Sequence, residues 1–566
     1  MTHADPKKAP MNFHRYRSYE PVRLTDRTWP DKVVTQAPAW CSVDLRDGNQ
    51  ALIDPMSVEE KKRLFQTLCE IGFKEIEVGF PAASETDFDF VRALIENQMI
   101  PDDVTIQVLT QARAELIEET FRSLQGCRRA IVHLYNSTSE LQRRVVFEQD
   151  KAGIKKIATD AAALVRKLAD AQTDTQWVFQ YSPESFTGTE MDYAVEVCDA
   201  VMDIWEPTPD RKLIVNLPAT VEMATPNIYA DQIEWFGRTV KHRDALILSL
   251  HTHNDRGTGV AASEMGVMAG ADRVEGTLFG NGERTGNVCI VTLALNLMSQ
   301  GVDPELDFSD IDRIATIAKE ITKLPIHPRH PYVGELVYTA FSGSHQDAIK
   351  KGFAALQKRN DDFWEVPYLP IDPKDVGRDY EAIIRINSQS GKGGVAHILA
   401  ERHGLDLPRA MQVAFSNIVQ AETTETGKEV DADTVWDLFL TTYINTEGPL
   451  RFVGCKVTSG ATTCRIEADV TIDGKATHFT GTGTGPIDAY LAGLETAAGL
   501  SATVCSFHEH AVATGSGAEA AAYVEVEGTS SGASGYGCAI DVNTVTASLK
   551  AVTSAVNRML ADNRKT

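Results

Sequence analysis

Two histidines, one residue apart, end an apolar run at residues 245–255, ALILSLHTHND. In an extended strand, side chains at positions i and i+2 point to the same side, so His251 and His253 would stand together at the strand end. Histidine is the commonest metal ligand in proteins, but two histidines also meet in cores or on surfaces without a metal. The pair therefore has two interpretations, a metal site or a structural contact, and its surroundings must decide between them.

The length and charge of the chain limit what kind of protein surrounds this pair. At 566 residues the chain is too long for one hydrophobic core, so about two to four domains are expected. The formal net charge of −24 argues against a nucleic-acid or membrane partner, since both need a basic face. Nine cysteines without CxxC spacing indicate reduced thiols and a cytoplasmic location. Neither a membrane-spanning run nor a secretory signal is expected.

Short β-rich apolar runs alternate with helical patterns between residues 39 and 283. One helical pattern, residues 57–72, begins with a capping box of Ser57 and Glu60 and ends at Gly72. Eight strand–helix units over roughly 250 residues are typical of a (β/α)8 TIM barrel. A doubly wound open sheet is the alternative, but no GxGxxG turn follows the first strand. The expected strands are residues 39–47, 75–81, 105–111, 129–137, 176–184, 213–221, 245–253 and 273–281.

In such barrels the reactive groups lie at the carboxyl ends of the strands. Charged, imidazole or hydroxyl groups follow six of the eight expected strands, which favours the metal interpretation of the two histidines. Asp47, His251 and His253 offer one carboxylate and two imidazoles, a set suited to Zn²⁺, Mn²⁺, Co²⁺ or Fe²⁺ and less to Mg²⁺. Asn287 would add a carbonyl oxygen. Because the set contains no cysteine, a closed structural zinc site is disfavoured.

The same rim supplies groups for chemistry on a 2-oxo acid. Its keto and carboxylate oxygens would chelate the ion, which would polarise the ketone as a Lewis acid. Arg46 would stabilise an enolate or alkoxide, or else form a salt bridge across the barrel end. Glu184 is a candidate general base or relay, and Thr220 would contact a carboxylate or keto oxygen. His133 and Tyr135 share one face of the fourth strand, where they either line the pocket or pack in the core.

After residue 330 the pattern changes. Residues 341–382 contain one helical pattern and several prolines, and residues 394–420 predict two helices joined at HGLDLP. Farther on, residues 482–499 resemble residues 535–557 in a glycine lead-in, an Ile-Asp pair and a helical pattern. Each copy follows alternating strand patterns, which predicts two β-β-α units in a pseudo-twofold domain. The run GTGTGP lacks the Lys-Ser/Thr of a phosphate loop and is expected to be a turn before a helix.

These changes divide the chain into five expected segments. They are an N-terminal extension (1–34), the α/β barrel (35–330), a first linker subdomain (331–384), a helical second linker subdomain (385–440) and a C-terminal α+β domain (441–566).

Two stretches of the sequence carry a family resemblance. LRDGNQ (45–50) with Lys61 downstream, and LSLHTHNDRGTGVA (248–261), resemble the signature stretches of the α-isopropylmalate synthase and homocitrate synthase family. The resemblance continues through SPESFTGTE, NLPATVEMATPN, GNGERTGN, AFSGSHQDAI and VPYLPIDP. It covers nearly the whole chain, including the C-terminal repeat.

The resemblance implies a Claisen-type condensation in leucine biosynthesis. Acetyl-CoA would lose a methyl proton, its enolate would attack the keto carbon of α-ketoisovalerate, and thioester hydrolysis would release 2-isopropylmalate and CoA. It implies a divalent metal cofactor (Mg²⁺, Mn²⁺ or Zn²⁺), with K⁺ as an activator. The implied metal ligands are Asp47, His251, His253 and Asn287.

The resemblance also assigns roles outside the metal site. His345 and Tyr368 look like the pair that family members bring into the partner subunit's active site, in a homodimer with linker exchange. The C-terminal domain resembles a leucine-sensing regulatory domain, so feedback inhibition by leucine is implied. Thr252 replaces a proline that close relatives often carry, and in an alternating strand it points away from the metal. The implied catalytic residues are Arg46, Glu184, His345 and Tyr368, and the implied substrate contacts are Arg46, Leu109, His133, Tyr135, Ser182 and Thr220.

Other functions remain open at this point. Homocitrate synthase and citramalate synthase share the metal site, but 2-oxoglutarate would need a basic residue for its second carboxylate. Leu109 and Tyr135 instead suggest an apolar pocket suited to an isopropyl group. A pyruvate–biotin carboxyltransferase or an acyl-CoA lyase would leave the C-terminal repeat unexplained. A catalytically inactive amino-acid sensor would leave the charged rim unexplained.

Overall fold

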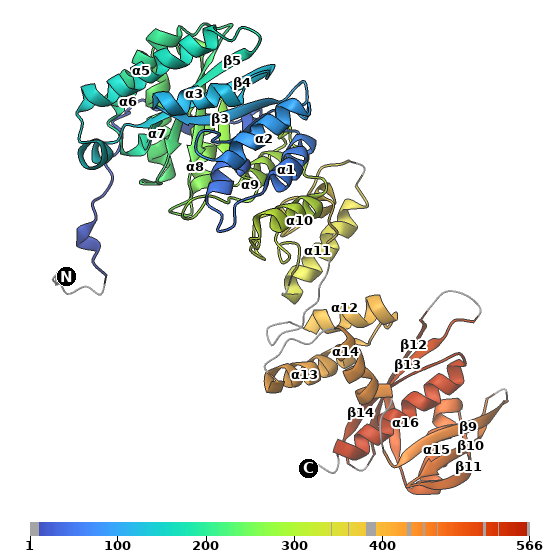
Figure 1. Cartoon of the computed structure of the whole chain (residues 1–566). Helices are drawn as coiled ribbons and strands as arrows, with labels where there is room; N and C mark the ends of the chain where they lie inside the picture. The colour runs from blue at the N-terminus through green and yellow to red at the C-terminus, as the bar shows by residue number, and fades with distance from the viewer. Residues whose placement is uncertain are drawn as a thin grey trace, which may run out of the picture. The chain divides into compact units, whose positions relative to one another are not determined.

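The computed structural model describes residues 11–562 except 341, 360, 381–391, 427–431, 445–447, 461, 513–516 and 530. The chain forms two compact units (Figure 1). The first contains the residues up to 337 together with 371–379, and the second contains 338–370 and the residues from 380 onward. Among the described residues, no helix is both long enough and apolar enough to cross a membrane.

The first unit is a closed barrel of eight parallel strands. The strands pair in chain order, and β8 pairs back onto β1. This confirms the expected (β/α)8 barrel and excludes the open sheet. Helices follow the strands and surround them (Figure 1). The strands are β1 (Ala39–Ser42), β2 (Glu75–Gly79), β3 (Thr105–Gln111), β4 (Arg129–Ser137), β5 (Gln176–Glu184), β6 (Leu213–Ala219), β7 (Leu246–Thr252) and β8 (Arg273–Gly276).

The capping signals in the sequence set the ends of the first helix, α1 (Val58–Ile71). Ser57 Oγ accepts a hydrogen bond from Glu60 N, and Glu60 Oε2 accepts one from Ser57 N at 2.8 Å. Gly72 ends the helix at a φ of 113°, a conformation that favours glycine. The other barrel helices are α2 (Glu85–Glu96), α3 (Ala114–Ser123), α4 (Glu140–Gln142), α5 (Lys151–Asp170), α6 (Met191–Trp205), α7 (Pro226–Thr239), α8 (Gly259–Met268), α9 (Ile290–Met298) and α10 (Ile311–Thr322).

The first strand, β1, is shorter than the expected residues 39–47, and this changes the backbone that carries Arg46 and Asp47. β1 ends at Ser42, and residues 44–48 form one turn of π-helix. Asp44 fixes this turn because its carboxylate accepts hydrogen bonds from Ser42 Oγ at 2.8 Å and from Leu278 N at 3.1 Å. Arg46 and Asp47 therefore stand on a π-helical turn, a feature often found at functional sites. The last strand also ends early, at Gly276.

The second unit contains two three-stranded antiparallel sheets, in the orders β11-β10-β9 and β12-β13-β14. Helices α12 to α14 pack on the second sheet in a core that includes Phe415, Phe439 and Tyr523. A second core joins both sheets to α15 and α16. The elements are α11 (Gly343–Leu356), α12 (Lys392–His403), α13 (Arg409–Thr426), α14 (Ala432–Phe439), β9 (Leu450–Ser459), β10 (Cys464–Ile472), β11 (Lys475–Gly483), α15 (Pro486–Ala498), β12 (Ala502–Ala511), β13 (Ala520–Gly528), β14 (Ser534–Asp541) and α16 (Thr544–Asp562).

The repeat is confirmed, but each copy is a β-β-β-α unit rather than β-β-α. The prediction missed β9 and β14, and it placed the first glycine lead-in, GTGTGP, in a turn. A Cβ at Gly481 in β11 would lie 1.9 Å from Ala489 O, and one at Gly537 in β14 would lie 2.1 Å from Ala551 O. These glycines let α15 and α16 lie directly on their strands. Only Gly485, at the start of α15, leads into a helix as expected.

The expected first linker subdomain, residues 331–384, is divided between the two units. Residues 371–379 pack with the barrel, where Arg378 donates to Asp312 Oδ1 and to Gly334 O, both at 3.0 Å. Residues 338–370 belong to the second unit. The five domain boundaries stay predictions.

Candidate active site

A cavity of about 250 Å³ opens at the carboxyl ends of the barrel strands. Every site residue predicted within the barrel lines it except Asn287. The lining comes from the π-helical turn after β1 and the residues that follow it, from strands β3 to β7 with the residues that follow them, and from the loop after β8. The lining residues are Arg46, Asp47, Gln50, Leu109, His133, Tyr135, Ser182, Glu184, Asn216, Pro218, Thr220, His251, His253, Glu283 and Arg284.

Asp47, His251 and His253 form a buried cluster that can hold a metal ion, with one ligand atom from each residue within 4.8 Å of the others. The Nε2 atoms of both histidines lie 3.6 Å from Asp47 Oδ2. The imidazole rings stack with centroids 5.3 Å apart, as expected for side chains two residues apart on a strand. Thr252 between them points the other way and meets Ser263 Oγ at 2.6 Å, which confirms the predicted alternation.

Two contacts orient this cluster. His251 Nδ1 lies 2.8 Å from Glu275 Oε2, so its other nitrogen faces Asp47. A carboxylate behind a histidine in this way is the usual partner of a metal-binding imidazole. Asn287 Nδ2 donates to Asp47 Oδ2 at 2.7 Å, while its Oδ1 is buried without a hydrogen-bond partner. The donor set and this unpaired oxygen fit a divalent cation, and direct coordination by Asn287 stays a prediction.

The charges of the cluster are strongly coupled. Burial alone would lower the pKa of His251, but Asp47 and Glu275 outweigh it and raise that pKa to about 9. Burial and the neighbouring His251 lower the pKa of His253 to about 4. Burial opposes ionisation of Asp47, but the Arg46 guanidinium and His251 hold its pKa well below its usual range. A cation would therefore meet an ionised Asp47 and a neutral His253, and would displace a proton from His251.

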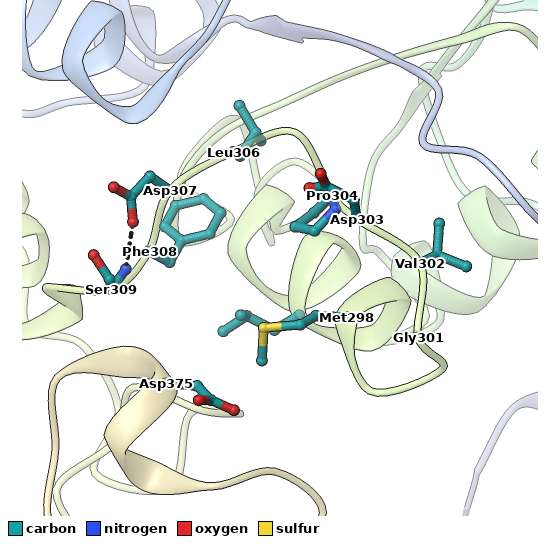
Figure 2. Close-up of a pocket in the computed structure, with 11 residues that line it drawn as sticks. Met298, Gly301, Val302, Asp303, Pro304, Leu306, Asp307, Phe308, Ser309 and Asp375 are labelled. Carbon is teal, nitrogen blue, oxygen red and sulfur yellow. Dashed lines mark hydrogen bonds between the residues drawn. The ribbon is translucent and has the colours of Figure 1, made fainter. Parts of the chain in front are cut away.

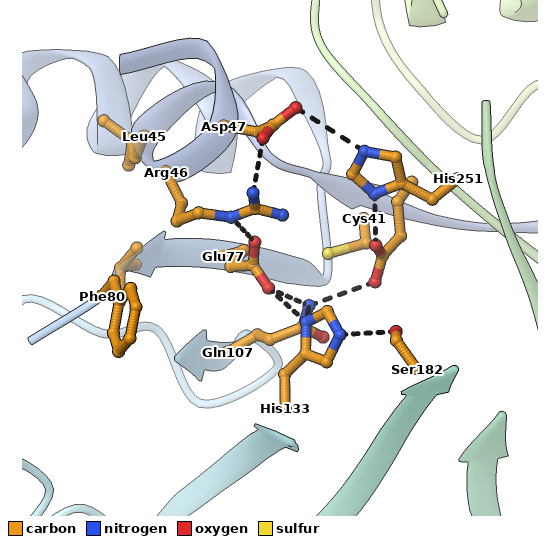
Figure 3. A network of polar contacts seen from close by, with 12 residues as sticks. Cys41, Leu45, Arg46, Asp47, Glu77, Phe80, Gln107, His133, Ser182 and His251 are labelled. Carbon is orange, nitrogen blue, oxygen red and sulfur yellow. Dashed lines mark hydrogen bonds and ion pairs between the residues drawn. The ribbon is translucent and has the colours of Figure 1, made fainter. Parts of the chain in front are cut away.

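A chain of polar contacts runs from Arg46 into the barrel (Figure 3). The Arg46 guanidinium bonds both the Asp47 and the Glu77 carboxylates. Glu77 Oε2 lies 2.7 Å from His133 Nδ1, and His133 Nε2 lies 2.7 Å from Ser182 Oγ. Arg46 thus forms salt bridges, which the sequence analysis gave as its alternative role, and it also lines the cavity. Its charge is fixed because Glu77 and Asp47 raise its pKa against the effect of burial.

Glu184 and Thr220 also line the cavity. Burial raises the pKa of Glu184, with only Arg46 acting to lower it. Ser185 follows Glu184 with a φ of 59°, an uncommon conformation for a non-glycine residue, and its N–H donates to Thr220 Oγ1 at 2.9 Å. Because that oxygen accepts from the backbone, the Thr220 hydroxyl proton is left to donate into the cavity.

Two predicted site residues lie outside the barrel unit. His345 and Tyr368 belong to the second unit, where both are exposed and their rings stack with centroids 3.9 Å apart. Tyr368 has a φ of 66°. Their place in an active site stays a prediction.

The sequence analysis missed several polar residues that build the site. Glu275, fully buried in β8, accepts from Arg273 and Gln180, both at 2.7 Å. Asn216 in β6 lines the cavity and donates to Ser182 Oγ at 3.0 Å. A signal for Asn216 was available, because it is a polar residue inside the otherwise apolar strand β6, where its side chain must find a partner in the barrel. For Glu275 the signal was Arg273 two residues earlier, on the same face of β8.

A second cavity of about 350 Å³ lies away from this chemistry (Figure 2). It surrounds the end of α9 and the loop before α10, and Trp40 at the start of β1 donates to Pro304 O there at 2.8 Å. It therefore lies at the amino end of the strands, which in these barrels serves stability rather than catalysis. Its apolar lining includes Met298, Leu306 and Phe308.

Comparison with known proteins assigns the chain to a family. It is 58% identical over 549 residues to a 2-isopropylmalate synthase of Rhodospirillum rubrum, covering 96% of this chain and 98% of that protein. It is 59% identical over 557 residues to a 2-isopropylmalate synthase of Parafrankia sp., covering 97% and 98%. The chain belongs to the 2-isopropylmalate synthase family. This confirms the resemblance drawn from the motifs, and the chain is accordingly a transferase-type condensing enzyme.

Family models match three regions of the chain. Residues 37–317 match the HMGL-like model, 335–400 the alpha-isopropylmalate synthase post-catalytic domain-like model, and 429–560 the LeuA allosteric (dimerisation) domain model. A hydroxymethylglutaryl-CoA lyase structure from Pseudomonas aeruginosa aligns over 52% of this chain and 96% of its own, with 18% identity and a TM-score of 0.43. That likeness is too low to support any argument about the site.

We predict that His253→Ala lowers the affinity for Mn²⁺ more than about 100-fold, because removing a ligand should cost more than the 10–100-fold typical of a supporting residue. Isothermal titration calorimetry on the metal-free protein measures this. His478→Ala, in an exposed pair with Asp469, is the matched control and should bind Mn²⁺ like the original protein. Unchanged Mn²⁺ affinity in the His253 variant would mean that the metal site is wrongly assigned.

Proposed function

We propose that the chain condenses acetyl-CoA with α-ketoisovalerate and hydrolyses the thioester, releasing 2-isopropylmalate and CoA. The observation that carries this proposal is the cluster of Asp47, His251 and His253 in a cavity that Arg46 and Glu184 also line. Relatives named 2-isopropylmalate synthase, matched over nearly the full length, support the same reaction. The product would be the first committed intermediate of leucine biosynthesis.

The proposed cofactor is a divalent cation held by Asp47 Oδ2 and by Nε2 of His251 and His253, with Asn287 Oδ1 beside it. When bound, such an ion supplies a Lewis acid that polarises the keto group. Mg²⁺, Mn²⁺ and Zn²⁺ are the candidates, and the two imidazoles favour the latter two. K⁺ as an activator is a further part of the proposal.

Arg46 and Thr220 are the proposed contacts to the keto acid. Arg46 presents a fixed positive charge next to Asp47, where negative charge would develop on the keto oxygen during attack. The Thr220 hydroxyl would donate to a carboxylate oxygen, because its own oxygen already accepts from Ser185 N. Both groups are held by neighbouring residues before a substrate arrives, so little reorganisation is needed.

Glu184 is the proposed group for proton transfer. Its carboxylate lines the cavity, and its pKa is raised by burial, which brings it closer to the working pH of a general base. It would take a methyl proton from acetyl-CoA directly or pass it on to His345. Acetyl-CoA would then add through its enolate to the keto carbon, and water would release CoA.

The side-chain pocket favours an isopropyl group over a second carboxylate. Leu109, Tyr135 and Pro218 line the cavity. Arg284 also lines it, but its guanidinium is engaged by Asp255 and by the Thr220 carbonyl, so a second substrate carboxylate would have to compete for it. Homocitrate synthase activity is thus disfavoured. Citramalate synthase activity, with the smaller pyruvate, is the second candidate.

The proposed assembly is a homodimer with exchanged linkers. His345 and Tyr368 would enter the partner's active site and complete it. The match of residues 429–560 to a dimerisation domain model supports a dimer. The same model is described as allosteric, which supports leucine binding in this region and feedback inhibition.

The reaction is tested by measuring CoA release with each 2-oxo acid in turn. We expect α-ketoisovalerate to give the highest kcat/KM, with pyruvate lower by more than 10-fold, since each missing methyl group in an apolar pocket costs about 1–3 kcal/mol. 2-Oxoglutarate should be the poorest acceptor. Faster CoA release with pyruvate or 2-oxoglutarate would reassign the substrate within the family.

The raised pKa of Glu184 predicts the acid side of the pH profile. A general base must be ionised, so kcat/KM should fall as the pH drops through a pKa above the ordinary 4.5 of a glutamate. Glu184→Gln should lower kcat by about 10²–10⁴-fold and remove this acid limb. The measurement is a pH–rate profile with Mn²⁺ saturating at every pH, which separates the effect from loss of metal. An unchanged acid limb in the Glu184 variant would show that another group is the base.

Linker exchange predicts complementation between two inactive variants. His345→Ala should lower kcat about 10²–10⁴-fold with little effect on α-ketoisovalerate affinity, the usual contribution of a positioned acid or base. Asp47→Ala should be inactive because the metal site is incomplete. Mixing the two should restore activity in heterodimers, which contain one intact site. No recovery after verified subunit exchange would rule out catalysis across the dimer.

Leucine regulation is tested by removing the C-terminal domain, residues 441–566. We expect the truncated enzyme to lose leucine inhibition, because leucine would bind in this domain and not in the active site. The two sites would then be linked by a coupling free energy, typically about 1–3 kcal/mol. Leucine titration against CoA release measures this, with the full chain as the control. Full leucine inhibition of an active truncated enzyme would refute the regulatory role.

A further inference from the structure

Lys61 on α1 is a wholly buried lysine that the proposed chemistry does not use. Its ammonium group donates to Asp87 Oδ1 at 2.6 Å and to the Leu45 carbonyl at 2.8 Å, and it lies 3.5 Å from the Val78 carbonyl. It also lies 5.4 Å from the centre of the Phe90 ring. A buried charge is costly unless its partners satisfy it, so these contacts form a set built around the ammonium group.

The two carbonyls belong to the segments that carry the site. Leu45 directly precedes Arg46 and Asp47 on the π-helical turn after β1. Val78 directly follows Glu77, whose carboxylate bonds Arg46, at the end of β2. Figure 3 shows the side chains of Arg46, Asp47 and Glu77 meeting between these two segments. One ammonium group thus contacts the backbone of both.

Asp87 on α2 extends this connection. Its Oδ1 accepts a hydrogen bond from Lys61 Nζ. Its Oδ2 accepts one at 2.8 Å from the N–H of Phe80, which lies in the loop just after β2. A Cβ at Gly79 would lie only 2.8 Å from Asp87 Cγ and Oδ2, so glycine leaves the room that this carboxylate needs. The end of β2 is shaped around the buried Lys61–Asp87 pair.

We propose that Lys61 is a positioning residue, whose ammonium group joins the turn after β1 to the end of β2 and so sets where Arg46, Asp47 and Glu77 stand. Lys61 acts through these residues and touches neither substrate nor metal. The effect on turnover rests on the proposed function, but the effect on backbone order does not.

The test replaces the charge by a side chain of similar length, Lys61→Met. Hydrogen exchange of the metal-free protein should become faster in residues 44–48 and 78–80. Mn²⁺ affinity should fall about 10–100-fold, as for other residues that support metal ligands. With Mn²⁺ saturating, KM for the keto acid should rise and kcat/KM should fall by about 10²-fold, since misplacement by about 1 Å has this effect.

Arg92→Met is the matched control. Arg92 also bonds a carboxylate and two backbone carbonyls, but it joins α2 to Ser123 and Gln125 at the end of α3, away from the strand ends that form the site. It should lower thermal stability without changing Mn²⁺ affinity or exchange in residues 44–48. Equal effects of the two variants on these readouts would mean that Lys61 contributes stability alone.

Folded Lys61→Met with unchanged exchange in both segments would overturn the proposal. If that variant does not fold, Asp87→Asn decides, because it keeps an acceptor for Phe80 N and removes the charge that holds Lys61. Faster exchange at residues 44–48 supports the proposal, and unchanged exchange overturns it. If the original protein releases no CoA, the proposed function fails, while the exchange comparison still decides the role of Lys61.

Discussion

The buried carboxylate of Glu275 is the constraint on which the site depends. It lies inside the barrel, where an uncompensated charge would be strongly destabilising, and Arg273 bonds it at 2.7 Å. Its second oxygen holds His251 Nδ1 at 2.8 Å. The carboxylate that Arg273 neutralises in the barrel interior is thus also the one that turns His251 Nε2 toward Asp47. The Glu275 carboxylate therefore contributes both to the stability of the barrel and to the geometry of the site.

The same arrangement balances the charge of the site. In the metal-free state the buried cations Arg46, Arg273 and protonated His251 match the buried anions Asp47, Glu77 and Glu275. A divalent cation that replaces the His251 proton would add one positive unit to this set. That added charge would attract an anionic keto acid, so metal and substrate are expected to favour each other's binding.

Much of the fold and of the candidate site could be predicted from the sequence. The eight strands were visible because parallel barrel strands are buried on both faces and appear as continuous apolar runs. His251 and His253 were placed correctly because a strand alternates strictly. The π-helical turn of Arg46 and Asp47 was missed, because it depends on Asp44 bonding Leu278, more than 200 residues away in sequence. Strand β14 was missed because its glycines, which let α16 pack closely on it, resemble a lead-in to the helix that follows.

The most direct test of this account is a crystal structure of the protein grown with Mn²⁺, read from anomalous scattering at the manganese edge. One peak is expected about 2.0–2.3 Å from Asp47 Oδ2 and from Nε2 of both His251 and His253. His251 Nδ1 should still bond Glu275. A cavity without a peak, or an ion held by other residues while His251 turns away from Glu275, would contradict this account.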